Sequence, residues 1–455
     1  MLTTFEQLCV KFASYAWGPW LLVLLFGGGL FFLFYSRFIP FRYLKHGIDI
    51  TRGKFDNPDD IGDIPHFQAL SSALAGTIGM GNISGVAIAI YMGGPGAIFW
   101  MWMSALVGVA TKFFTCSLAI MYRGKDSQGQ YQGGPMYVIT EGLGKKWKPL
   151  AVFFCLAGLI GCLPAFQANQ LVQVLREMIF IPRGWIGQNY FLFNLISGLS
   201  IAGLVALVIF GGIVRIGQVA SRIVPAMVLI YLAPVIYTLV TNYTHIPEYF
   251  KLIVVDAFSG KAVAGGAVWT VMITGIRRAA FSNEAGIGTE EMAHGAAKTL
   301  EPIREGLVAM MGPIADTIIA CTVTALMILF TGTWKGGEVN GVTMTARAFE
   351  IAIPGVGSYI LIICVLFFSV STMFSYSYYG SKCLGFLIGA ERKHYYNYFY
   401  VILIIVASVV SLTTVVNIID GFFALMAIPT MISSLLLAPK VMVAARDYFK
   451  RMKHG

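Results

Sequence analysis

The uncharged stretch 71–90, SSALAGTIGMGNISGVAIAI, combines glycines with polar side chains suited to binding ions. Gly79 and Gly81 lie at its centre, between Thr77 and Asn82. If a helix breaks here, its freed carbonyl groups can bind a cation and its freed N–H groups a carboxylate. The positive end of the following half-helix would stabilise the bound anion. The alternative is a continuous helix whose glycines allow another helix to approach closely.

A second polar cluster lies in 267–291, AVWTVMITGIRRAAFSNEAGIGTEE. Thr270 and Thr274 belong to its apolar part, and Arg277 and Arg278 follow soon afterwards. Arginines this far into a membrane span are costly unless they face water or a partner. The pattern favours a half-helix that lines the cytoplasmic exit of a pathway, with Glu284 as an ion-pair partner. The alternative is a helix that ends at the arginines and continues as a loop.

Two further apolar segments contain polar side chains. In PAFQANQ, 164–170, Phe166 and Gln170 are four residues apart and share one helix face. An aromatic wall with an amide suits a small zwitterion, and an interhelical hydrogen bond explains the pair equally well. In FFSVSTMFSYSYYG, 367–380, the clustered hydroxyl groups include those of Ser371 and Thr372, which are ligands for a hard cation such as Na⁺. Alternatively, such hydroxyl groups bond back to carbonyl groups of their own helix.

Two carboxylates, Asp316 and Asp420, lie within or beside apolar segments, where each could carry a proton or make structural hydrogen bonds. The sequence contains no HExxH, GxSxG or P-loop motif, so we predict that the protein is not an enzyme. The lack of a nucleotide-binding motif also argues against an ATP-driven pump.

The composition indicates residence in a membrane. Hydrophobic residues make up 57% of the 455 residues, charged residues make up 12%, and the mean hydropathy is +0.75. A soluble chain of this size cannot hide so much apolar surface in one core. The chain also contains long apolar segments, most of them with more than 18 residues and few charges. Such segments predict an all-α polytopic membrane protein. We predict eleven spanning helices, at 18–38, 66–92, 95–122, 149–176, 190–212, 219–242, 262–288, 305–332, 355–381, 397–418 and 420–444.

The distribution of basic residues predicts the orientation. The net charge is +10, but most Lys and Arg residues fall in segments on one side of the predicted spans. This positive-inside pattern places the N-terminus outside and the C-terminus in the cytoplasm of a multi-pass cell-membrane protein. It leaves no basic stripe for a nucleic acid. The basic residues that carry the assignment are Arg37, Arg42, Lys45, Arg52 and Lys54, together with Lys440, Arg446, Lys450, Arg451 and Lys453.

The spans suggest one transmembrane domain, 1–455, with an internal repeat. The extra N-terminal helix occupies 1–40, and ten spans remain in two halves, 66–242 and 262–444. Five spans in each half would give the halves opposite orientations. Each half also opens with a glycine-interrupted span, which points to the binding site of an inverted-repeat transporter.

Three stretches resemble the alanine or glycine:cation symporter family, the sodium/alanine symporters. They are GGPGAIFWMWMSALVGVATKF at 93–113, GTIGMGNISGVA at 76–87 and FSNEAGIGT at 281–289. The resemblance covers nearly the whole chain in the same order. It implies a leucine-transporter-type 5+5 inverted repeat with one extra N-terminal helix, and Na⁺-coupled uptake of alanine or glycine.

The resemblance also implies site residues. The amides of Gly79 and Gly81 would hold the substrate carboxylate, and a second helix would unwind at WTVMIT, 269–274. The residues expected to contact substrate are Thr77, Gly79, Gly81, Asn82, Phe166, Gln170, Trp269, Thr270, Ile273 and Thr274. The residues expected to bind Na⁺ are Ala75, Thr77, Ile78, Asn82, Thr270, Ser371 and Thr372, with Ala75 and Ile78 acting through their carbonyl groups.

We therefore expect a sodium-coupled symporter that imports a small neutral amino acid, alanine or glycine, by alternating access. Its partners would be the amino acid, Na⁺ and membrane lipid. Two alternatives remain: a proton-coupled symporter that uses Asp316 or Asp420, and a passive channel for small polar solutes.

Overall fold

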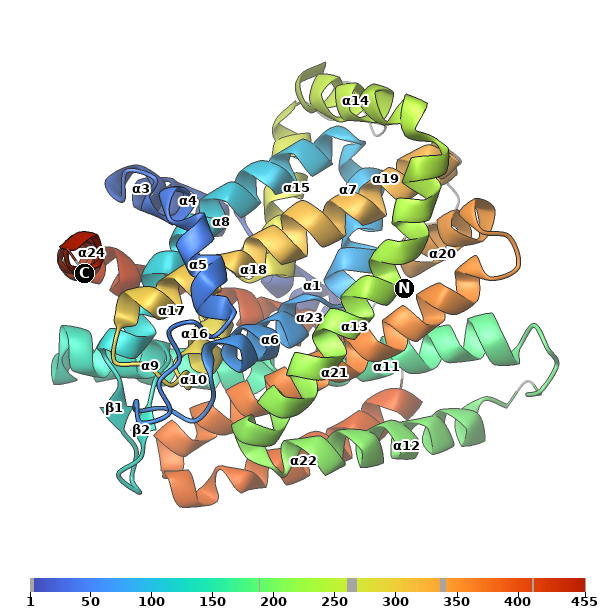
Figure 1. Cartoon of the computed structure of the whole chain (residues 1–455). Helices are drawn as coiled ribbons and strands as arrows, with labels where there is room; N and C mark the ends of the chain where they lie inside the picture. Colours follow the sequence, from blue (N-terminus) through green and yellow to red (C-terminus); the bar gives the residue numbers. More distant parts are fainter. Residues whose placement is uncertain (1–3, 188, 260–267, 336–340, 411–412, 455) are drawn as a thin grey trace.

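The computed structural model describes residues 4–187, 189–259, 268–335, 341–410 and 413–454. Most of them are helical (Figure 1), as expected of a chain whose backbone hydrogen bonds must be made internally in lipid. One short hairpin pairs β1 (Gly124–Lys125) with β2 (Tyr131–Gln132) in antiparallel register.

The α-helices follow one another along most of the chain. In order they are α1 (Thr4–Ala16), α2 (Pro19–Leu22), α3 (Gly28–Tyr35), α4 (Ile39–Arg42), α5 (Leu44–Thr51), α6 (His66–Thr77), α7 (Val86–Gly93), α8 (Gly96–Met121), α9 (Pro135–Tyr137), α10 (Lys148–Gly161), α11 (Ala165–Leu175), α12 (Phe191–Ile209), α13 (Gly212–Thr241), α14 (Ile246–Ser259), α15 (Val268–Asn283), α16 (Thr289–His294), α17 (Pro302–Ala309), α18 (Met311–Pro313), α19 (Thr322–Thr331), α20 (Gly341–Ala352), α21 (Gly357–Ile388), α22 (His394–Val409), α23 (Thr413–Leu425) and α24 (Ala427–His454). Turns of π-helix occupy Val23–Gly27, Gly81–Gly85, Val138–Leu143, Arg176–Phe180 and Ile314–Cys321.

Within the described residues, eight helical segments are long and apolar enough to cross a membrane. A ninth arises if the bent pair formed by His66–Thr77 and Gly81–Gly93 is one span. The eight are Thr4–Tyr35, Gly96–Met121, Lys145–Phe180, Phe191–Ile209, Gly212–Thr241, Pro302–Thr331, Gly357–Ile388 and Val415–Met452. The multi-pass membrane class is therefore confirmed.

Within the described residues, the helices found at the predicted spans 262–288 and 397–418 are shorter than the roughly 18 residues needed to cross a membrane. Each gives only a 16-residue helix, α15 and α22. Residues 262–267 of the first and 411–412 of the second lie outside the described residues. The predicted boundary between 418 and 420 is wrong, because α23 continues through it to Leu425. Asn417 and Asp420 of this helix line a cavity.

α6, the first part of the bent pair, lies near the middle of the molecule (Figure 1). α6 packs against α13, α16 and α21, whereas α8 packs against α15 and α17 and α12 packs against α22 (Figure 1). Elements distant in the sequence therefore meet around the first bend. α6 is thus enclosed by protein, with ten of its 12 residues buried.

A buried ion pair links two of these elements. Lys112, deep in the 26-residue helix α8, donates to Glu290 of α16, and both side chains are almost completely buried. Nearby, His66 of α6 and His294 of α16 both bond to the carboxylate of Glu305 in α17. These contacts join α6, α8, α16 and α17 through charges that lipid cannot solvate.

The Lys112–Glu290 pair predicts a strong non-additive effect of substitution. Lys112→Met leaves a buried carboxylate without its cation and should cost about 3–5 kcal/mol of stability. Lys112→Met combined with Glu290→Gln should recover most of that loss. Thermal unfolding of the purified protein in detergent measures both.

The control for this cycle is Lys54→Met. It breaks the exposed Lys54–Asp49 pair and should change the unfolding temperature little. A double variant no more stable than Lys112→Met would contradict the pairing.

Candidate functional site

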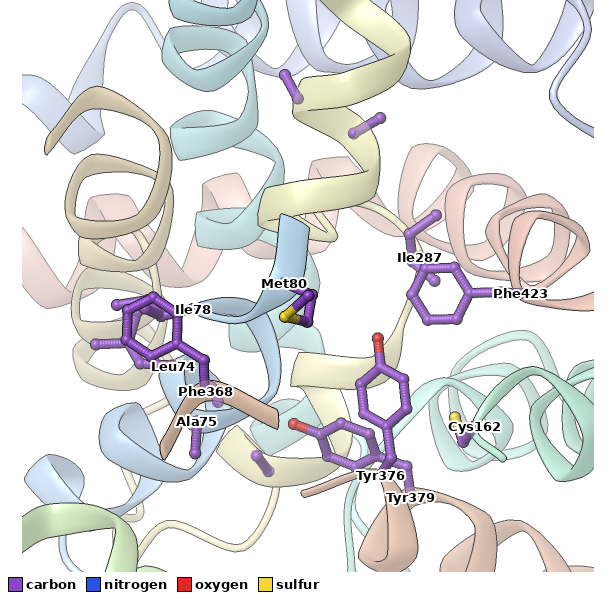
Figure 2. Close-up of a cluster of buried hydrophobic side chains, with 14 of the residues drawn as sticks. Leu74, Ala75, Ile78, Met80, Cys162, Ile287, Phe368, Tyr376, Tyr379 and Phe423 are labelled. Atoms are coloured by element: carbon purple, nitrogen blue, oxygen red, sulfur yellow. The ribbon is translucent and has the colours of Figure 1, made fainter. Parts of the chain in front are cut away.

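The predicted break in the first interrupted helix is confirmed. α6 ends at Thr77, Ile78 is extended with ψ 93°, and the helical direction changes by 53° before Gly81–Gly93. Figure 2 shows Met80 at this bend, with Tyr376 of α21 and Phe423 of α23 among its surroundings. A side chain at Gly79 would meet the hydroxyl of Thr372, because an added Cβ would lie 2.8 Å from that oxygen.

The side chain of Asn82 makes hydrogen bonds to Gly79 in the break and to Asp316. Its Oδ1 accepts from the Gly79 N–H at 2.8 Å, and its Nδ2 donates to Asp316 Oδ1 at 2.6 Å. The backbone carbonyl of Asn82 accepts from Thr324 Oγ1 at 2.8 Å. In this conformation the Asn82 side chain accepts from the Gly79 N–H, the donor expected to hold the substrate carboxylate, so that role stays a prediction.

Asp316 connects this network to the second interrupted helix. Its Oδ2 accepts from Ser282 Oγ of α15 at 2.9 Å and from Thr317 Oγ1 at 2.7 Å. Asp316 lies in the π-helical turn Ile314–Cys321, whose wider winding accommodates these inward contacts. Both oxygens of the buried carboxylate are thus hydrogen-bonded.

The second interruption lies later than predicted. α15 is continuous to Asn283, and α16 begins at Thr289. Between them the backbone takes positive φ at Glu284 (55°), Gly286 (84°) and Gly288 (101°). Glycine adopts such angles without strain, so GIG determines the break and WTVMIT does not.

The four candidates from α15 therefore do not reach the cavity between the breaks. Trp269 and Thr270 are exposed at the start of the helix. Ile273 is half-buried, and Thr274 is buried against Gly93, where an added Cβ would lie 3.3 Å from the threonine. Their expected roles in binding substrate and Na⁺ assumed an unwinding point that the helix does not have.

A small cavity of about 30 Å³ lies between the two breaks. It brings together the predicted residues Thr77, Gly79, Gly81, Phe166 and Thr372. Its lining is completed by Gly76, Met80, Gln167, Phe281, Glu284 and Tyr376. A larger cavity of about 200 Å³ shares Gly81, Phe166, Gln167, Phe281 and Tyr376 with it and extends to Arg278, Asn417 and Asp420.

The amide that lines these cavities is Gln167, and Gln170 does not line them. Gln170 Nε2 donates to Gln173 Oε1 at 3.3 Å. The Oε1 atom of Gln167 is buried and has no hydrogen-bond partner among the described residues. Helix spacing from Phe166 favoured Gln170, but α11 starts at Ala165, so its first turn points at the cavity.

Of the expected cation ligands on α21, Thr372 lies against α6, whereas Ser371 contacts Met227 of α13. Thr372 Oγ1 donates to the Gly76 carbonyl at 3.4 Å and to the Phe368 carbonyl at 2.9 Å. Ser371 Oγ donates to the Phe368 carbonyl at 3.1 Å. Both hydroxyl groups thus bond back within their helix, and Thr372 also contacts the C-terminal end of α6. The part of the chain that the structure describes contains no group of three or more His, Cys, Asp or Glu side chains arranged for a metal ion.

The predicted pairing of Glu284 with the arginines is wrong. Glu284 Oε1 accepts from the Tyr376 hydroxyl at 2.6 Å, and Oε2 accepts from Thr289. Arg277 lies over the ring of Trp17, 5.8 Å from its centroid, and Arg278 lines the larger cavity. Both arginines precede the break, so they belong to α15 and not to the half-helix beyond it.

Two interrupted helices that meet at one cavity, inside a bundle of apolar helices, define a polytopic membrane transporter of the broken-helix class. The fold is similar to that of MhsT in complex with L-phenylalanine, with a TM-score of 0.55 at 14% identity, covering 84% of this chain and 98% of that one. The chain belongs to the sodium:alanine symporter family, which matches residues 2–455. The predicted family is thus confirmed.

Curated relatives extend over the same length. The sodium/alanine symporter AgcS of Methanococcus maripaludis is 39% identical over 440 residues, covering 96% of this chain and 95% of the relative. An uncharacterized transporter of Haemophilus influenzae is 37% identical and covers 99% and 97%. The probable sodium/glutamine symporter GlnT of Bacillus subtilis is 33% identical and covers 96% and 90%. The protein is therefore a transporter and not an enzyme.

The close approach at Gly79 predicts a sharp effect of one methyl group. Gly79→Ala drives a Cβ against Thr372 Oγ1, so the break must open or shift, and uptake of labelled alanine should fall at least about tenfold. The matched control is Gly203→Ala in α12, where an added Cβ has no neighbour within 4 Å. Equal uptake by the two variants in proteoliposomes would show that the break tolerates displacement.

Proposed function

We propose that this protein imports small neutral amino acids, alanine or glycine, together with Na⁺ by alternating access. The observation that carries the proposal is the small cavity at which both interrupted helices end. The C-terminal ends of α6 and α15 present carbonyl groups there, and the helix Gly81–Gly93 presents its N–H groups. Carbonyl ends favour a cation, and the N–H end favours a carboxylate.

Coupling follows from charge. A carboxylate and Na⁺ placed close together in a low-dielectric site each reduce the cost of desolvating the other. Each ligand should therefore raise the affinity for the other by the same factor. On this proposal, Thr372 with Ser371 and the carbonyls of Ala75 and Ile78 supply one Na⁺ site, since Thr372 already reaches the end of α6.

The lining favours a small side chain. Phe166, Phe281 and Tyr376 line both the small cavity between the breaks and the adjoining larger cavity. On this proposal, these aromatic rings close around the bound amino acid and exclude bulky side chains. The relative from Methanococcus maripaludis, described as a sodium/alanine symporter, supports the same substrate class.

We also propose the finer architecture. One domain, 1–455, would contain eleven spans: the extra N-terminal helix within 1–40, then inverted five-span repeats at 66–242 and 262–444. The support is that the two interrupted helices, α6 with α7 and α15 with α16, open the two halves. The basic residues favour an external N-terminus and a cytoplasmic C-terminus in the cell membrane.

The test is uptake of labelled alanine into proteoliposomes. We expect accumulation above equilibrium when a Na⁺ gradient is imposed. Flow only down the alanine gradient would identify a passive channel, and accumulation driven by a pH step without Na⁺ would identify proton coupling. Either result would overturn the proposal.

Asn82→Ala should abolish this uptake while leaving folded protein. The variant removes the acceptor for the Gly79 N–H and the donor to Asp316, so the break loses its fixed geometry. Monodisperse elution in size-exclusion chromatography checks folding, and Na⁺-driven uptake checks function. Wild-type uptake by the folded variant would refute the role of Asn82.

A further inference from the structure

The buried carboxylates of this protein differ in how their charge is balanced. Glu290 pairs with Lys112, and Glu305 bonds to His66 and His294. Glu284, Glu291 and Asp316 are also buried, yet none forms an ion pair with a Lys, Arg or His of the described residues. A buried carboxylate without a cation is costly, so each needs strong hydrogen bonds, a proton or a cation from outside.

Glu284 differs from the other two because it lines the cavity between the breaks. Glu291 and Asp316 are not part of the lining of either cavity at this site. A ligand bound in this cavity can therefore contact Glu284. Glu284 also adopts a positive φ of 55°, a conformation that non-glycine residues seldom take and that here directs the chain out of α15.

The contacts of Glu284 orient the carboxylate and leave it unsatisfied. The Tyr376 hydroxyl donates to Oε1 at 2.6 Å, and the Thr289 hydroxyl donates to Oε2. Each oxygen accepts one neutral hydroxyl bond, and each retains capacity for another donor. An ammonium group has three N–H donors and a full positive charge, which matches that remaining capacity.

The lining of the cavity offers partners for both charges of a zwitterion: backbone N–H groups for a carboxylate, and a carboxylate for an ammonium group. The N–H end of Gly81–Gly93 contributes Met80 and Gly81 to the lining, and Glu284 lies on the lining at the carbonyl end of α15. A free amino acid carries a carboxylate and an ammonium group on one carbon, so one molecule can meet both. With one Na⁺ at the end of α6, the loaded site would carry no net charge.

We propose that the carboxylate of Glu284 is the counter-charge for the α-ammonium group of the substrate. This inference rests on the proposed function, because it assumes an amino acid in the cavity. It gives the site a means of excluding molecules that have a carboxylate and a small side chain but no amino group.

The experiment compares Glu284→Gln with wild type, using labelled alanine, L-lactate as competitor and ²²Na⁺. L-Lactate has the alanine skeleton with a hydroxyl group in place of the ammonium group. Glutamine keeps the size and the capacity to accept one hydroxyl bond but loses the charge. We expect alanine affinity to fall about 10- to 100-fold, with ²²Na⁺ binding in the absence of alanine unchanged. The preference for alanine over lactate should fall by a similar factor.

Two further variants separate recognition from structure. Glu284→Asp keeps the charge and should retain the preference for alanine over lactate, even where overall affinity drops. Glu291→Gln is the matched control, since it neutralises a buried carboxylate seven residues later that does not line the cavity. It should leave the preference unchanged.

The outcomes are distinguishable. Wild-type alanine affinity in folded Glu284→Gln overturns this inference and leaves the proposed function standing. Loss of ²²Na⁺ binding in that variant also overturns it, since Glu284 would then be the partner of Na⁺. Absence of Na⁺-dependent alanine binding in the wild-type protein overturns the proposed function itself.

Discussion

Every interruption of a helix in this protein has to satisfy its own freed backbone groups, because lipid offers no hydrogen bonds in exchange. At the first break, the side chain of Asn82 takes the Gly79 N–H, and Thr324 bonds to the carbonyl of Asn82. The backbone at the break is therefore held in place by specific side-chain hydrogen bonds. The residues at its edge line a cavity, where a bound solute can make further hydrogen bonds.

The same constraint explains why the two breaks are coupled. Asp316 accepts from Asn82 beside the first break and from Ser282 just before the second, so a single carboxylate holds both. Because both oxygens of Asp316 are hydrogen-bonded, moving one half-helix without the other would leave a buried acceptor unsatisfied. The interrupted helices can thus shift together more cheaply than apart.

The sequence predicts the membrane class from its composition and apolar segments, and the family from the motifs at 76–87, 93–113 and 281–289. It predicts the first break from the glycines and polar side chains within the uncharged stretch 71–90. It does not locate the second break, since Gly286 and Gly288 act through backbone angles that no hydropathy pattern reports. Gln167 and Glu284 were missed as cavity-lining residues for a related reason. The start of α11 and the exact end of α15 decide which way these side chains point, and helix ends are the least predictable feature of a sequence.

The ion pair between α8 and α16 has a consequence for biosynthesis. Lys112 and Glu290 are 178 residues apart, so the lysine enters the membrane long before its partner is made. At about 5–20 residues per second, the delay is roughly 10–40 s. During that time the insertion machinery must accept a charge that costs about 2.5–3.5 kcal/mol near the centre of a span. The favourable insertion of the apolar residues of α8 offsets this cost. The ion pair can form only after Glu290, in the second half of the protein, has been synthesised.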